Sequence, residues 1–164
     1  MSGIFNDLGP CEVWFDEAKL GVYDGDVIFR ETGESRPVHE AEKGVTEVDS
    51  IRVGKTVEVE MSLTRESLAK LATILPGATL PSETKIDVYN NAIGTSRYDN
   101  AKELIIKPIE DGAVSANTKW LTIPKASPEI DSELMFNNDN QRVWKVVFKA
   151  FPDASTGKLY TIGA

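Results

Sequence analysis

Residues 56–63 alternate strictly between apolar and polar side chains, and this pattern constrains the fold more than any other feature of the sequence. The apolar positions are Val57, Val59, Met61 and Leu63. The polar positions are Thr56, Glu58, Glu60 and Ser62. Because successive side chains of a β-strand point to opposite faces, the pattern predicts a strand with one face in a core and the other in water. Such a strand needs a sheet around it.

Shorter apolar segments, separated by turn residues about every eight to twelve positions, indicate antiparallel β-structure along most of the chain. We expect further strands at 12–15, 20–23, 26–32, 85–89, 104–109, 120–123, 143–151 and 159–162. Gly54-Lys55 is expected to form a hairpin turn ahead of the alternating strand. The polar segment 33–44 is expected to be extended, and Pro37 limits it to a sheet edge or a loop.

One segment has helical spacing instead. Its apolar residues fall at i, i+3, i+4 and i+7, namely Leu68, Leu71, Ala72 and Leu75. They predict one amphipathic helix over about 64–75, with Thr64 as its N-cap. We therefore predict a mainly β fold with one helix packed on it. The longest polar connections, 90–100 and 126–141, are candidates for function or for contact between subunits.

The composition limits what the chain can bind. It has 26 acidic and 18 basic residues and a net charge of −8, which argues against tight binding of nucleic acid. The longest aliphatic runs have three residues, far fewer than the roughly 20 of a membrane-spanning helix. The N-terminus has no pattern of a secretory signal, so we expect a cytoplasmic chain. No linker or repeat divides it, and we expect a single domain over 1–164.

Few residues are suited to catalysis or metal binding. One histidine, His39, and one cysteine, Cys11, exclude a site built on several of either and a disulfide within the chain. Glu58 and Glu60 would lie about 7 Å apart on one strand face, a spacing compatible with an acid/base pair, but a solvated strand face is favoured because nothing else catalytic accompanies them. We expect no enzyme, no cofactor and no metal. Residues 40–60 hold six acids and three bases, so we predict an acidic face on this hairpin.

Several segments carry a resemblance to a known family. They are LGPCEVWFD at 8–16, Leu20-Gly21, TEVD at 46–49, ILPGA at 74–78, IPKA at 123–126, VVFKAFPD at 146–153 and LYTIG at 159–163. In this order and spacing the chain resembles the tail tube, or major tail, proteins of tailed bacteriophages over nearly its whole length. One departure is Glu47, where the family usually has proline.

The resemblance implies a two-sheet β-sandwich or half-barrel with a flanking helix. It also implies subunits that assemble as hexameric rings, stacked into a hollow tube through which the phage genome passes. The partners would be further copies of the chain, tape-measure, baseplate or tip, and tail-terminator proteins, and a sheath in a contractile tail. The protein would be assembled in the host cytoplasm and reside in the virion. An acidic conduit would let DNA pass without holding it.

Two sets of residues become site candidates on this basis. Glu58 and Glu60, with Lys55 at the rim, are hypothesised to face the lumen; the alternative is an outer solvated face or a subunit contact. Contacts between rings are assigned to an extended loop at about 33–48 and to an N-terminal arm at about 1–10. The candidates in the loop are Glu34, Arg36, His39, Glu40, Glu42 and Lys43.

Two other functions fit the same pattern. A ring-forming protein of a contractile injection or secretion machine would share the fold and deliver effectors instead of DNA. A carbohydrate-binding β-sandwich would use Trp14, Trp120 and Trp144 as stacking platforms, although tryptophans within strands more often pack in a core or an interface.

Overall fold

The computed structural model describes residues 10–23, 25–65, 67–90 and 93–163. The strands are β1 Cys11–Phe15, β2 Ala18–Lys19, β3 Val22–Tyr23, β4 Ile28–His39, β5 Glu47–Arg65, β6 Ala78–Ser82, β7 Lys85–Val88, β8 Lys102–Glu110, β9 Ala113–Val114, β10 Leu121–Ile130, β11 Trp144–Ala150 and β12 Thr161–Ile162. The helices are α1 Leu68–Ile74 and the 3-10 turns η1 Ala41–Lys43 and η2 Asn117–Lys119. The prediction of a mainly β fold is confirmed.

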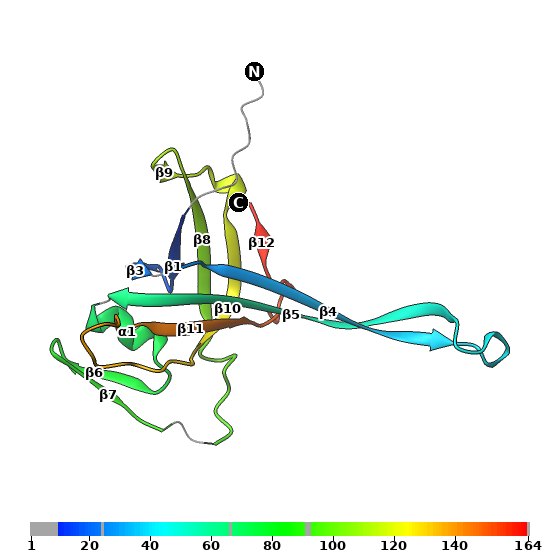
Figure 1. Ribbon diagram of the computed structural model, residues 1–164, viewed down its shortest axis with the longest axis horizontal. Helices are drawn as coiled ribbons and strands as arrows, with labels where there is room; N and C mark the ends of the chain where they lie inside the picture. The colour runs from blue at the N-terminus through cyan, green and yellow to red at the C-terminus, as the bar shows by residue number, and fades with distance from the viewer. Residues whose placement is uncertain (1–9, 24, 66, 91–92, 164) are drawn as a thin grey trace.

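Ten of these strands form one antiparallel sheet. Its order is β2-β1-β8-β10-β11-β5-β3, with β12 beside β10, β4 beside β5 and β9 beside β8. The strands β6 and β7 pair separately as a small second sheet. Figure 1 shows that β8 and β10 run across the direction of β5 and β11, so the large sheet bends over on itself. The two halves of the bent sheet enclose the core between them.

The core contains the apolar face that the alternation predicted. Val57, Val59, Met61 and Leu63 are at most 1% exposed. Phe15 of β1 and Phe148 of β11 meet across the core with their ring centres 5.0 Å apart. The helix α1 adds Ile74, which is fully buried. Burial of large side chains from both halves of the sheet is the main stabilising contribution to such a fold.

The helix begins later than predicted. Thr64 lies in β5, and the N-cap is Ser67, whose hydroxyl accepts a hydrogen bond from the Lys70 amide at 3.4 Å. The strand β5 therefore extends past Leu63 through the position predicted for the N-cap. The connection predicted at 126–141 is also shorter, because 126–130 belongs to β10 and Ala126 is fully buried there.

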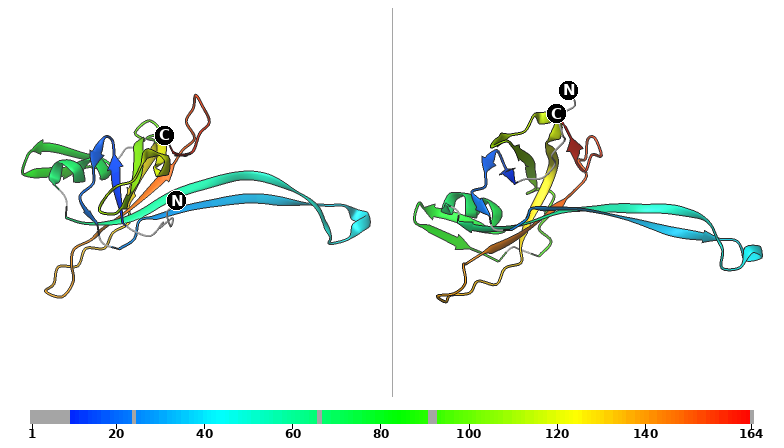
Figure 2. Two further views of the ribbon diagram at one scale, coloured as in Figure 1. Left: turned by 90° about the horizontal axis from the view of Figure 1, so that it is seen from above. Right: turned by 45° about the horizontal axis from the view of Figure 1, so that its top comes forward.

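The strands β4 and β5 form a hairpin that reaches far beyond the rest of the molecule (Figures 1 and 2). The extended loop expected at 33–48 is therefore mostly strand, with its turn at η1. The hairpin turn predicted at Gly54-Lys55 is wrong, because β5 runs without a break from Glu47 to Arg65. Pro37 lies in β4, which is an edge strand as its proline requires.

Candidate functional site

The distal part of the hairpin, residues 33–55, is here called the arm, and no second layer formed by the described residues lies against it (Figure 2). All of its residues are exposed except Val38, which is half-buried. A two-stranded ribbon is marginally stable in water when nothing covers a face of it. The arm nevertheless carries large apolar side chains that are exposed, and these are Val45, Val48, Ile51 and Val53. Sequence reasoning missed them as a surface because they are spaced two or three residues apart and separated by polar residues, so they form no apolar run.

The six residues predicted to make contacts between rings all lie on the arm. Glu34, Arg36 and His39 are spread along β4, while Glu40, Glu42 and Lys43 lie at the tip. Lys43 and Glu40 form an ion pair at 3.0 Å. The predicted N-terminal arm at 1–10 lies outside the described residues, except for Pro10.

The arm joins the body at a cluster that we call the clamp, made of Phe29, Glu31, Lys55 and Tyr160. The hydroxyl of Tyr160 donates a hydrogen bond to one carboxylate oxygen of Glu31, and the ammonium of Lys55 lies 2.9 Å from the other. The ring of Tyr160 packs edge-on against Phe29, with 5.1 Å between their centres. The clamp thus connects the C-terminal segment to both strands of the hairpin.

The clamp also alters the ionisation of its members. The hydrogen bond from Tyr160 and then that from Lys55 lower the pKa of the Glu31 carboxyl, with Arg52 adding a weaker attraction. The same hydrogen bond raises the pKa of the Tyr160 hydroxyl. Both directions follow because the bond joins the protonated phenol to the ionised carboxylate.

Acid is expected to weaken the clamp. Because the pKa of Glu31 is lowered in the folded state, its carboxylate stabilises the fold above the ordinary value of 4.5, and this contribution is lost as the pH falls through the folded-state pKa. The free energy of unfolding of the wild-type chain should therefore exceed that of Glu31→Gln near neutral pH and approach it in acid. Urea denaturation of both chains at about pH 7 and about pH 3 measures this. A difference that does not change with pH would contradict it.

The sheet face that carries Glu58 and Glu60 also carries basic side chains from the neighbouring strands. Arg30 of β4 and Lys149 of β11 lie directly opposite Glu58 in register. Lys145 of β11 lies 3.0 Å from Glu60, and Arg30 lies 4.0 Å from it. The acidic face predicted from β5 alone is therefore interleaved with three bases. The structure brings Glu58 and Glu60 to one face but places Lys55 on the other, toward Glu31.

Among the described residues, two of the sheet edges that have no strand beside them belong to long strands. One is the outer edge of β4, whose other side pairs with β5 along its whole length. The second is the edge of β10 over 127–130, which faces away from β11. There the guanidinium of Arg97 donates to the Ser127 carbonyl at 3.3 Å and pairs with Glu129 at 2.9 Å. Unpaired strand edges of this kind are places where another chain can add a strand.

The faces of two of the tryptophans are in contact with a lysine. The ammonium of Lys107 lies 4.3 Å from the ring centre of Trp14 and 4.1 Å from that of Trp120. The indole of Trp14 also donates to Glu12 at 3.0 Å. The two contacts of Lys107 are cation–π interactions, which stabilise the packing of the segments that carry these residues. The lysine thus occupies the space between the two rings that a sugar would need for stacking there.

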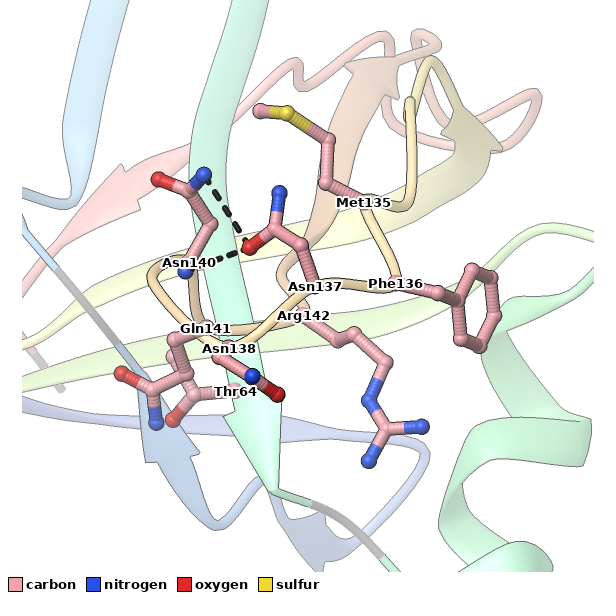
Figure 3. Close-up of a pocket in the computed structure, with 8 residues that line it drawn as sticks. All are labelled: Thr64, Met135, Phe136, Asn137, Asn138, Asn140, Gln141 and Arg142. Atoms are coloured by element: carbon pink, nitrogen blue, oxygen red, sulfur yellow. Dashed lines mark hydrogen bonds between the residues drawn. The ribbon is translucent and has the colours of Figure 1, made fainter.

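Two hollows at the surface have mostly uncharged linings. Figure 3 shows one of about 480 Å³, lined by Thr64, Met135, Phe136, Asn137, Asn138, Asn140, Gln141 and Arg142. The carbonyl oxygen of the Asn137 side chain accepts hydrogen bonds from the Asn140 amide and side chain and so shapes the loop. A second hollow, of about 510 Å³, lies beside the open edge of β10 and includes Arg97 and Glu129. Amides dominate the first hollow, and its lining contains no acid, histidine or cysteine.

Within the described part of the chain, no three histidine, cysteine, aspartate or glutamate side chains are grouped closely enough to hold a metal ion. No helix among the described residues combines the length and the apolar character needed to cross a membrane. No protein-family model matches this chain, and no curated protein matches it.

Proposed function

We propose that the protein is a structural subunit that polymerises as stacked rings into a phage tail tube, a conduit for genome ejection. The observation that carries this proposal is the arm, a ribbon that extends from the body and exposes four aliphatic side chains. In a monomer the apolar side chains of this ribbon stay in water, so they do not stabilise the fold. Burial against a second copy would stabilise both the ribbon and the contact.

The two open sheet edges support ring formation. The strands β4, β5, β11 and β10 follow one another in antiparallel order, so β4 and the open part of β10 run in opposite directions. The β4 edge of one copy can therefore pair antiparallel with the β10 edge of the next. Because the two edges differ, this contact is head-to-tail, and such contacts close into a ring when the rotation allows it. The hexameric number comes from the family resemblance.

The conduit surface proposed for this ring is the face that carries Glu58 and Glu60. It follows from the same pairing, because that face is common to all four strands that would continue around the ring. Lys145, Lys149 and Arg30 lie on it too. Because acidic side chains alternate with the basic ones on this surface, it would not bind the phosphates of DNA tightly. The surface therefore still suits a conduit through which DNA passes. Partners at the tube ends, and the virion as the site of the assembled protein, are part of the same proposal.

Negative-stain electron microscopy of the purified chain over a range of concentrations tests the proposal. Rings or tubes of uniform bore are expected, with sedimentation velocity reporting a concentration-dependent rise in mass. A chain that stays monomeric at every concentration would refute it. Tubes that assemble but exclude double-stranded DNA would favour the effector-delivering machine, whose subunit would share this fold.

A further inference from the structure

The hairpin has a local weakness where the arm leaves the body. Gly33 of β4 lies opposite Lys55, and Gly54 of β5 lies opposite Glu34, so the two glycines are one register step apart. A Cβ built on either would meet no atom within 4 Å. Glycine within a strand has no side chain to pack and leaves the backbone freer to bend. Neither glycine is therefore required by crowding.

The strand ladder is also interrupted at this point. Glu34 pairs with Gly54 and Ser35 with Arg52, so Val53 is an extra residue on β5 and forms a bulge. A bulge breaks the run of hydrogen bonds and bends its strand. The bulge and both glycines thus lie within one short section of the ribbon, residues 33–34 and 53–54, which we call the hinge.

The hairpin is held firmly on the body side of the hinge. Val57, two residues after Lys55, is fully buried, and so is Val59, which lies opposite Phe29. The clamp follows directly, with Tyr160 contacting Phe29 and Glu31 from the C-terminal segment. The ribbon therefore changes from a packed strand pair to an exposed one across the hinge.

We propose that the arm swings as a unit about the hinge, and that Tyr160 sets its direction by fixing the strands at the root of the arm. The role of this motion in assembly rests on the proposed function. The arm would swing until it reaches its binding site on a second copy, and burial of its apolar side chains would then fix it there. The C-terminal segment then has a role in assembly through the contacts of Tyr160 with Phe29 and Glu31 at the root of the arm. Tyr160 is a positioning residue in this account.

Distance measurements between spin labels test the hinge. Labels at Val45→Cys on the arm tip and Glu83→Cys on the β6–β7 turn, in a Cys11→Ser background, report the direction of the arm. Both labelled positions are exposed. The Tyr160→Phe substitution keeps the ring but removes the hydroxyl, and the distribution of distances should broaden. Gly33→Thr with Gly54→Val adds β-branched residues, which favour strands, and should narrow it.

Hydrogen exchange tests the clamp separately. In Tyr160→Phe, amide exchange over 28–33 should rise about three- to tenfold, the factor for one net hydrogen bond. The matched control is Tyr98→Phe, which removes a hydroxyl that accepts from the Ala154 amide at 2.9 Å elsewhere on the C-terminal segment. The inference would be overturned if the distance distributions were the same in all variants. It would also be overturned if the two tyrosine substitutions changed amide exchange over 28–33 equally. All measurements use the chain below its assembly concentration, so the absence of tubes would refute the proposed function and leave this result standing.

Discussion

A chain in which Asn-Gly replaces residues 33–55 is expected to fold and to form no tubes. The replacement joins Thr32 to Thr56, which are partners in register, through a two-residue loop of the type that hairpins favour. Deleting only 36–43 would be less informative, because it removes the β4 partners of Asp49, Ser50 and Ile51 and leaves that part of β5 unpaired. The full replacement removes both strands of the arm together.

The expected effect on assembly is large because the arm carries the exposed aliphatic side chains. Burying one such side chain contributes about 1.5–3 kcal/mol. Loss of two would then raise the critical concentration for tube formation at least about 100-fold, since 1.4 kcal/mol corresponds to a factor of ten. Sedimentation and microscopy measure this, and circular dichroism checks that the body is folded.

A point substitution gives the graded version of the same test. Ile51→Ser, at a residue that is 60% exposed, should raise the critical concentration about tenfold or more. The control is Ser50→Ala at the neighbouring residue, which replaces one small side chain with another. It should have little effect on the critical concentration. If the arm replacement still forms tubes of the wild-type bore, the arm has no role in their assembly.

Replacing Phe148 with alanine is expected to reduce the free energy of unfolding by about 3–5 kcal/mol. The side chain is fully buried and lies against Phe15 from the opposite half of the sheet. Its removal leaves a cavity at the contact between the two halves, which the bent sheet cannot easily fill. Since small domains are stable by about 5–15 kcal/mol, much of the total stability would be lost.

The matched control is Phe136→Ala, the same substitution at a residue that is 77% exposed. It should change the free energy of unfolding by no more than about 0.5 kcal/mol. Urea denaturation of both variants in the arm-replaced background avoids interference from assembly. Equal effects at the two positions would show that the core does not lie between β1 and β11.

The sequence was sufficient to predict the core face of β5 and the class of fold. Strict alternation from Val57 to Leu63 leaves one choice of buried set, and the structure buries that set. The bounds of this strand were harder to predict, because alternation does not indicate where a strand begins or ends. Gly54 resembles a turn residue locally, yet it lies within a strand because Glu34 pairs with it from β4.

The candidate site could be predicted only in part for a similar reason. The arm residues from Glu34 to Lys43 were found as a polar extended segment, but the clamp joins Glu31 to Tyr160, which is 129 residues away in sequence. Likewise, the charges around Glu58 depend on Arg30 and Lys149, whose positions follow from strand order. No local pattern in the sequence contains that pairing.

The composition of the arm has a consequence for spectroscopy. Residues 33–55 contain no tryptophan, tyrosine or phenylalanine, while Trp14, Trp120 and Trp144 all belong to the body. Intrinsic fluorescence therefore does not report on the arm, whereas far-ultraviolet circular dichroism records the strands of the arm together with those of the body. A melting curve followed by both signals would diverge if the ribbon lost its strand pairing at a lower temperature. Such a divergence, which usually indicates a folding intermediate, would here indicate separate melting of a segment that the chromophores do not sample.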